Sequence, residues 1–425
     1  MTQLAAEQRA WRLLVAAFMA FVVLCAASLY GVYWFIFQSF VQLNITATAA
    51  RGTAQVDLPE EQVSVAIPEL RRDMEIGSTV HTDTTSEVVI SFTDPNTDLP
   101  LAYLYVLRDS VVRLQQAQAP RFSLNSSPYQ IQLTAIQGKC IMVIVNDTQR
   151  PVSFSASSLQ GSMDTTSAGQ YTVEVTQDWT RVSVKDGEAD LVADQDSNPL
   201  HLSSNQHAYL AKGIQAQHPV VDKSLVDNGQ FTAPYSAGWK AYSNGDPVGV
   251  VSSGTVDGLP VVTIDRGQER WPDLILDHGE TGLVQSLNVD VSNYNSLELQ
   301  ASFYVQEQSL STCGVAGSEC PLMIRVVYTD SGGNDRVYIH GFYAFQDANL
   351  GYPTLCDTCR SEHDRVRMQT WYTYNENLFS ILPPEQRPQF IREIWFYASG
   401  HAYIVHIAQM DLVGTKLRPP GSTSN

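Results

Sequence analysis

The chain has 425 residues, a formal net charge of -18 and only 16% charged residues. This length suits two or three folding units, because domains usually contain about 100–200 residues. The negative charge excludes a duplex nucleic-acid binder, which needs a basic surface to displace counterions from phosphates. Ser, Thr, Asn and Gln supply the polarity instead, a composition typical of β-rich extracytoplasmic proteins.

An uncharged apolar run lies near the N-terminus, over residues 13–37. At about 1.5 Å rise per residue it is long enough to cross a hydrocarbon core of about 30 Å. Arg9 and Arg12 precede the run, and the next charge after it is Arg51. The positive-inside rule therefore predicts a single-pass plasma-membrane protein with a cytoplasmic stub at residues 1–12 and every later domain outside.

Two other interpretations compete with an uncleaved anchor. Ala26-Ala27-Ser28 is similar to the cut site of a signal peptide, but the apolar run continues well beyond it. Cys25 follows a short hydrophobic stretch, as the modified cysteine of a bacterial lipoprotein does, yet Leu24 stands where a small residue is needed. We therefore expect the helix to remain as a membrane anchor.

The residues that follow the anchor are small and polar at 44–50, which predicts a stalk over residues 38–50. Beyond it, residues 51–425 contain 24 basic and 43 acidic residues. Such acidity opposes contact with anionic lipid headgroups. The composition thus predicts an ectodomain that stands off the membrane.

Short runs with alternating polar and apolar residues characterise residues 51–213, and no long helical period interrupts them. The runs lie at 87–92, 103–107, 129–133, 140–145, 152–156, 171–175 and 180–184. Gly187 follows the last run within a sequence typical of a tight turn. This pattern predicts an all-β domain.

The order of these runs resembles the periplasmic domain of FecR-type regulators. The segments that carry the resemblance are 75–83 (EIGSTVHTD), 86–92 (SEVVISF), 169–175 (GQYTVEV), 180–189 (TRVSVKDGEA) and 200–213 (LHLSSNQHAYLAKG). The resemblance implies a β scaffold without catalysis. Gln170 departs from the family's usual Thr, and the short stub has no counterpart of its cytoplasmic anti-sigma helices. Control of a sigma factor is therefore not inferred.

After a linker at 214–224, alternating runs return over residues 225–415, and a flexible tail is expected at 416–425. The runs predict eight or nine strands with long loops, which suits a β-sandwich or jelly roll. The segments 225–231 (LVDNGQF), 238–239 (GW), 282–291 (GLVQSLNVDV) and 407–412 (IAQMDL) resemble galactose-binding-like jelly rolls and carbohydrate-binding modules. That fold serves sugar binding and plain structural roles alike, so its function depends on the site.

Aromatic side chains are the candidates for stacking on sugar rings in this domain. Trp239, Trp271 and Trp371 are the predicted ligand-binding residues, with Arg266 in the polar loop that precedes Trp271. Trp395 lies inside the run IREIWFY and is expected in the core. Exposure of the three predicted tryptophans in one concavity would support sugar binding.

No cofactor is required by the sequence, but the resemblance implies one structural metal site. In related modules a calcium ion joins the first strand to the last through carboxylate and backbone oxygens. Asp411 matches the terminal carboxylate, and Asp227 is the residue that would join it.

Four of the six cysteines lie in the second outer domain: Cys313, Cys320, Cys356 and Cys359. Outside the membrane, thiols tend to oxidise, so we expect two disulfides, with three pairings open. A zinc site is the alternative, using the four thiolates or recruiting His340 or His363. The gap between Cys313 and Cys320 is wrong for a zinc ribbon, which favours disulfides.

Catalytic motifs are absent from the sequence: it contains no GxSxG, HExxH, GxxxxGK[ST] or GxGxxG pattern. The leading hypothesis is a noncatalytic envelope protein that presents a module for a glycan or protein ligand. The alternative is a structural or assembly component of the cell surface. An extracytoplasmic glycosidase using a pair such as Asp273 and Asp277 is a third hypothesis, motivated only by the jelly roll and its acids.

Overall fold

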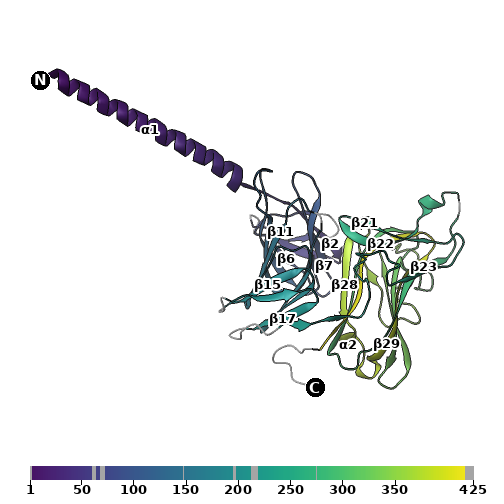
Figure 1. The fold of residues 1–425 in the computed structure, drawn as a ribbon. Helices are drawn as coiled ribbons and strands as arrows, with labels where there is room; N and C mark the ends of the chain where they lie inside the picture. The colour runs from purple at the N-terminus through teal and green to yellow at the C-terminus, as the bar shows by residue number, and fades with distance from the viewer. Residues whose placement is uncertain are drawn as a thin grey trace.

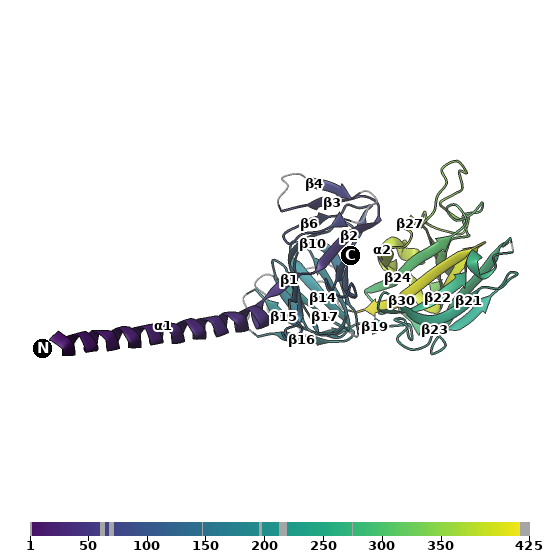
Figure 2. The same cartoon turned by 90° about the horizontal axis from the view of Figure 1, so that it is seen from above.

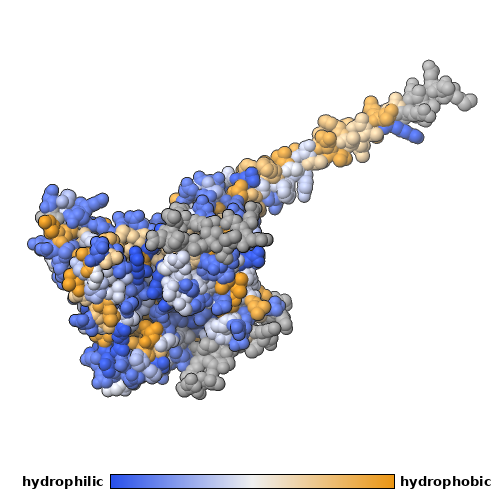
Figure 3. Space-filling model, turned by 180° about the vertical axis from the view of Figure 1, so that it is seen from behind, coloured by the Kyte–Doolittle hydropathy of each residue, from blue (hydrophilic) through white to orange (hydrophobic). Residues whose placement is uncertain are grey.

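One long helix and two β domains make up the computed structural model (Figure 1). It describes residues 2–59, 64–67, 72–146, 148–194, 198–211, 219–273 and 275–416. The helix α1 (Thr2–Gln38) contains one candidate membrane span, Ala10–Gln38, none of which is buried in the protein. It leaves the first domain on the side opposite to the second (Figure 2). On the face drawn in Figure 3, apolar residues cover much of the described helix surface, whereas the β domains are largely polar.

The first domain is a closed barrel in which the long strand β10 (Tyr129–Ile144) belongs to both halves. One half runs in the order β4 (Ser64–Ile67), β3 (Ala54–Asp57), β6 (Thr79–His81), β9 (Val111–Pro120), β10, β11 (Val152–Ser157), β12 (Gly161–Thr165), β15 (Glu188–Ala193) and β16 (Leu200–Ser203), with β1 (Phe40–Gln42) also beside β9. The other half runs β5 (Arg72–Asp73), β2 (Asn44–Arg51), β7 (Glu87–Thr93), β8 (Pro100–Val106), β10, β13 (Gly169–Val175), β14 (Trp179–Asp186), β17 (Gln206–Ala211) and β18 (Val220–Val221).

The alternating sequence explains this domain, because every second side chain of a strand points to the same face. In β11, Val152, Phe154 and Ala156 are buried, while the serines between them are half-buried. The core also contains Phe92 and Tyr171. The predicted all-β fold is confirmed here.

The predicted stalk at residues 38–50 is wrong. Residues in this segment form β1 and most of β2, and β2 pairs with β7 inside the domain. Ile45 and Ala47 are buried in the core. Small residues such as alanine fit where strands pack closely, so the composition that suggests a stalk also suits a buried strand.

The second domain is a sandwich of two sheets, as expected, and their strands pair antiparallel except for the short β27 beside β26. The sheet next to the first domain, here called the proximal sheet, runs β21 (Val250–Val256), β22 (Leu259–Arg266), β30 (Tyr403–Thr415), β24 (Ser296–Gln308) and β28 (Trp371–Asn377), with β19 (Lys223–Ser224) also beside β30. The distal sheet runs β20 (Lys240–Ser243), β23 (Gly279–Asp290), β29 (Pro388–Gly400), β25 (Leu322–Asp330), β26 (Asp335–Tyr343) and β27 (Asp364–Arg365). Short helices complete it: η1 (Gln268–Arg270), α2 (Leu378–Ile381) and η2 (Pro384–Gln386).

Aromatic side chains from both sheets fill the space between them. Phe303 of the proximal sheet lies 4.7 Å from Phe342 of the distal sheet, measured between ring centroids. Phe396 also lies on this inner face and is fully buried. Large rings supply much of the buried apolar area of such a sandwich.

The predicted linker at 214–224 lies partly outside the described residues, as do residues 417–425 of the predicted tail. Its described end is not a free linker. Two of its residues form β18, which pairs with β17 of the first domain, and β19 then pairs with β30 of the sandwich. Asp222, between these strands, contacts Nδ1 of His207 at 3.0 Å. The connection between the domains is therefore held on both sides.

A shared apolar cluster joins the two domains. Tyr103, Tyr105, Ile141 and Val145 of the first domain belong to the same buried cluster as the core of the sandwich. The hydroxyl of Tyr103 donates to the carbonyl of Asp257 at 3.2 Å. The domains thus pack as one body and do not hang as beads on a string.

Candidate functional site

The outer face of the proximal sheet is closed by charged contacts with the first domain. Glu298 Oε1 accepts a hydrogen bond from Arg181 Nη1 at 2.9 Å, and Glu298 Oε2 lies 3.3 Å from Lys139 Nζ. Burial would raise the pKa of Glu298, but the two cations hold it well below its ordinary range. Gln170 donates to Gln409 Oε1 at 3.1 Å beside this pair. The side chains on this part of the sheet are therefore already engaged by the first domain, and the cavities that remain between them are small.

The outer face of the distal sheet presents aromatic side chains. Tyr242 of β20 and Tyr397 of β29 lie opposite Gly282 of β23, on either side of that strand. One row further along, Trp395 of β29 lies opposite Arg325 of β25. We call Tyr242, Arg325, Trp395 and Tyr397 the aromatic platform. Because opposite residues of paired strands share a face, the register alone places these four side chains together.

Ring and cation contacts define the geometry of the aromatic platform. The rings of Tyr242 and Trp395 meet edge to face, with centroids 5.3 Å apart. The guanidinium carbon of Arg325 lies 5.6 Å from the Trp395 ring and 4.9 Å from the Tyr397 ring. Arg325 Nη2 also donates to the Tyr397 hydroxyl at 3.1 Å. Packing of a cation between two rings fixes their positions, and Tyr242, Trp395 and Arg325 remain half-exposed, whereas Tyr397 is buried.

Carboxylates at the edge of the aromatic platform hold the polar ends of the rings. Tyr242 donates to Glu280 Oε1 at 2.8 Å, and Trp395 Nε1 donates to Glu393 Oε2 at 2.9 Å. Burial, reinforced by Glu280, raises the pKa of Tyr242, so this hydroxyl stays a donor at neutral pH. The arrangement combines ring surface with charged hydrogen-bonding groups, which suits binding of a molecule with both C–H and hydroxyl faces.

Two of the predicted tryptophans are buried, and their predicted stacking role is wrong. Trp239 is 4% exposed, and its ring centroid lies 4.8 Å from that of Phe396 in the core. Trp371 is also 4% exposed, and its Nε1 donates to Asp257 Oδ2 at 3.0 Å. A ring enclosed on all sides offers no face to a ligand. Their large apolar area explains why the fold uses them as core residues.

Arg266 is likewise structural, contrary to its predicted ligand role. It is 0% exposed and donates to the backbone carbonyls of Pro247 at 3.0 Å and Asp277 at 2.7 Å. A buried guanidinium needs such acceptors. Trp271 is half-exposed in the loop after β22, with Arg270 5.8 Å from its ring centroid. The ligand-binding role of Trp271 stays a prediction, unlike that of the buried Trp239 and Trp371.

The sequence expectation for Trp395 holds only in part, because its ring is half-exposed and packs against a small buried cluster that includes Tyr397, outside the main core between the sheets. Its neighbours Ile394 and Phe396 are fully buried. Alternation along β29 therefore sends Trp395 to the opposite face. The alternation in the run IREIWFY separates Trp395 from its neighbours. The sequence does not show which of the two faces of this strand is covered by the rest of the protein.

The two predicted calcium ligands have different surroundings. Asp411 is 1% exposed, forms an ion pair with Lys185 of the first domain and accepts from the Ser224 hydroxyl at 2.7 Å. Asp227 is exposed, and its backbone N–H donates to Gln285. Among the described residues, neither belongs to a cluster of three metal-ligating side chains. Lys185 already supplies the positive charge that calcium would bring to Asp411.

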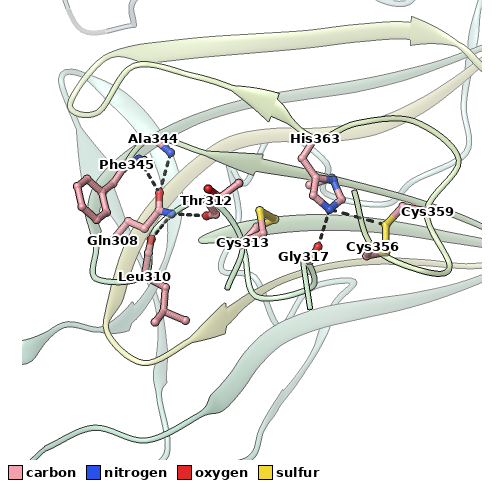
Figure 4. The surroundings of a disulfide bond; sticks show 12 residues. Gln308, Leu310, Thr312, Cys313, Gly317, Ala344, Phe345, Cys356, Cys359 and His363 are labelled. Atoms are coloured by element: carbon pink, nitrogen blue, oxygen red, sulfur yellow. Dashed lines mark hydrogen bonds between the residues drawn. A yellow bond between two sulfur atoms is a disulfide. The ribbon is translucent and has the colours of Figure 1, made fainter. Parts of the chain in front are cut away.

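Two disulfides form within the sandwich, Cys313–Cys320 and Cys356–Cys359, which confirms the expected oxidation (Figure 4). His363 Nε2 donates to the Gly317 carbonyl at 2.7 Å and lies 3.8 Å from Cys359 Sγ. Its Nδ1 accepts from the Gly341 N–H at 2.9 Å, which leaves the ring proton on Nε2. With all four sulfurs in disulfides, no thiolate of this group remains for the alternative zinc site. His363 instead ties the two loops together.

Gln308 fastens the same loops from the other side (Figure 4). Its Nε2 donates to the carbonyls of Leu310 at 2.7 Å and Thr312 at 2.6 Å. Its Oε1 accepts from the backbone N–H of Ala344 at 2.6 Å. A single buried amide thus satisfies backbone groups of both loops.

No family model matches the chain, and no curated protein matches its sequence. Solved structures do show similarity. A putative anti-sigma factor from Parabacteroides distasonis is 11% identical, with 37% of this chain and 70% of that chain covered and a TM-score of 0.25. A family 11 carbohydrate-binding module from Clostridium thermocellum is 16% identical, covering 46% and 98%, with a TM-score of 0.27. The CBM22-1 xylan-binding domain of Paenibacillus barcinonensis Xyn10C is 11% identical, covering 46% and 97%, with a TM-score of 0.26. At this level of similarity, the function rests on the residues of this chain.

Proposed function

We propose that this chain is a single-pass membrane protein that presents a noncatalytic glycan-binding face outside the cell. The aromatic platform is the observation that carries this proposal. Half-exposed rings of Tyr242 and Trp395, with Arg325 packed against Trp395, offer stacking surface beside hydrogen-bonding groups. A sugar has apolar C–H faces and a rim of hydroxyls, so both kinds of contact are used at once.

The membrane part of the proposal rests on α1. Its span Ala10–Gln38 is apolar and exposed along its length, which is unfavourable in water and favourable in lipid. Arg9 and Arg12 precede the span, which by the positive-inside rule supports a cytoplasmic N-terminus. The two β domains then lie outside, with the sandwich on the far side of the first domain from α1 (Figure 2).

The closed proximal sheet supports the choice of the distal face. Glu298 and Asp411 on the proximal sheet are already paired with cations of the first domain. The first domain thus serves as a rigid support that orients the distal sheet. Glu280 and Glu393 each accept from an aromatic side chain, a positioning role that needs no catalysis.

The test uses the full chain in nanodiscs on a glycan array that includes neutral and acidic polysaccharides. We expect retention of at least one glycan class by the wild type and loss of retention in Trp395→Ala. Trp179→Ala is the matched control, because its ring is likewise half-buried but lies on β14 of the first domain. Equal retention by both variants would contradict the assignment of the site.

Two further measurements separate the competing functions. Absence of any retained glycan, together with concentration-dependent self-association, would favour a structural or assembly role through protein contacts. Products released from the same glycans would indicate a glycosidase and overturn the noncatalytic assignment. Unchanged glycans after prolonged incubation are the expected result.

A further inference from the structure

The end of α1 is fixed to the first domain and is not followed by a hinge. The Ser39 carbonyl accepts from the Arg121 N–H at 3.0 Å, and β1 then pairs with β9 through Phe40 and Pro120. Phe35 of the helix meets Phe122 edge to face, with centroids 5.3 Å apart. The loop 121–128 therefore lies against the last turns of the apolar helix.

Arg150 gives this loop a defined shape. Its guanidinium donates to the backbone carbonyls of Phe122 at 3.2 Å and Ser123 at 3.1 Å, and also to that of Asn125. Asn125 is 2% exposed, and its Oδ1 accepts from the Ser127 N–H at 2.9 Å. Many backbone polar groups of the loop are thus hydrogen-bonded within the protein. A segment must meet this condition to enter an apolar medium.

The outward side of the loop carries an exposed apolar side chain, Leu124, among the exposed residues Arg121, Ser123 and Ser126. Leu124 is 68% exposed, and Phe122 is half-exposed beside Phe35. A single exposed leucine is common on a soluble surface. Here it projects from a loop with internally bonded carbonyls, next to the exit of an apolar helix. Arg121 lies over the Phe35 ring, with its guanidinium carbon 5.8 Å from the centroid, where its charge can reach headgroup phosphates.

We propose that the loop 121–128 docks onto the outer surface of the bilayer and inserts Leu124 at the boundary between headgroups and acyl chains. This inference rests on the proposed membrane anchoring of α1, and the bilayer is the occupant because Phe122 and Leu124 continue the apolar surface of that helix. It reverses the expectation of an ectodomain that stands off the membrane. The excess acidity of the ectodomain does not oppose this contact where the lipids are zwitterionic.

Site-directed spin labels on the full chain in zwitterionic nanodiscs test the proposal, in a Cys25→Ala background. The label at Leu124→Cys is compared with one at Leu159→Cys. Leu159 is 72% exposed and follows the other end of β11 from Arg150, which makes it a matched control. We expect the label at 124 to be several-fold less accessible than the label at 159 to a water-soluble relaxation agent.

A third label, at Val23→Cys within α1, reports insertion of the helix separately. An immersed label at 23 with equal water accessibility at 124 and 159 would overturn the docking and leave the anchoring intact. A label at 23 that is exposed to water would overturn both. Arg150→Gln, which releases the loop carbonyls, is expected to raise the water accessibility at 124 while the label at 23 stays immersed.

Discussion

Arg181 of the first domain and Glu298 of the sandwich form a buried ion pair across the domain interface, with Nη1 and Oε1 2.9 Å apart. Lys139 binds the other oxygen of the same carboxylate. One glutamate thus receives two cations from β14 and β10. The two strands come from different parts of the first domain, so this carboxylate joins the barrel to the sandwich at two points.

Substitution Glu298→Gln is expected to destabilise the protein by about 3–5 kcal/mol, because it removes the carboxylate that pairs with Lys139 and leaves the buried Arg181 with Asp222, 3.4 Å away, as its remaining ion-pair partner. Denaturant unfolding measures this change. The exposed pair Arg392–Asp335 provides the control, since its side chains are 45% and 66% exposed. Removal of that pair by Arg392→Ala should change the stability by less than about 1 kcal/mol. Similar effects of both substitutions would contradict the bridging role of Glu298.

For Glu87 we predict a pH dependence of folding stability that is opposite in sign to that of most carboxylates. Burial raises its pKa to about 7, although Arg108 and Arg51 partly oppose the shift. The folded state therefore binds this proton more tightly than the unfolded chain, whose glutamate pKa is about 4.3. Stability from this group is present below about pH 4.3 and is lost as the pH rises to about 7.

Thermal unfolding of the wild type and Glu87→Gln between pH 4 and pH 8 tests this sign. The amide cannot ionise, so the wild type should lose stability relative to the variant as the pH rises. The comparison cancels contributions from other groups, such as His363, whose pKa is lowered chiefly by burial. A wild type that gains stability relative to the variant over this range would rule the mechanism out.

Cysteine chemistry gives a prediction about reactivity. Cys140 is 2% exposed, and burial raises the pKa of its thiol to about 12. The thiolate is the reactive form, so a maleimide should modify Cys140 only after denaturation. Peptide mapping without reductant should also find Cys313–Cys320 and Cys356–Cys359 as closed pairs. Modification of Cys140 in the native protein, or cross-loop disulfides, would contradict this structure.

Sequence patterns predicted the strands well because alternation is a local property. The pattern at 152–156 fixed which side chains of β11 point inward before any partner strand was known. The same local pattern could not predict which outer face of the sandwich is open. Alternation separates Trp395 from Ile394 and Phe396, but only the packing of the first domain on the proximal sheet shows which outer face remains open. The stalk prediction for the segment that contains Ile45 was wrong for the same reason, because the strand that pairs with this segment, β7, lies far along the chain.

Asp411 provides a test of the structural calcium that its position suggests. Lys185 and the Ser224 hydroxyl already bind its carboxylate, and its side chain is buried. We therefore expect EDTA to leave the Tm of the full chain unchanged. Substitution Lys185→Met should lower the free energy of unfolding by about 3–5 kcal/mol, because it leaves a buried carboxylate without a counter-charge. Asp411→Asn in the same background should recover part of this loss by removing that charge. A rise in the wild-type Tm on addition of calcium, reversed by EDTA, would instead show that a cation binds the native protein beside the Lys185 contact.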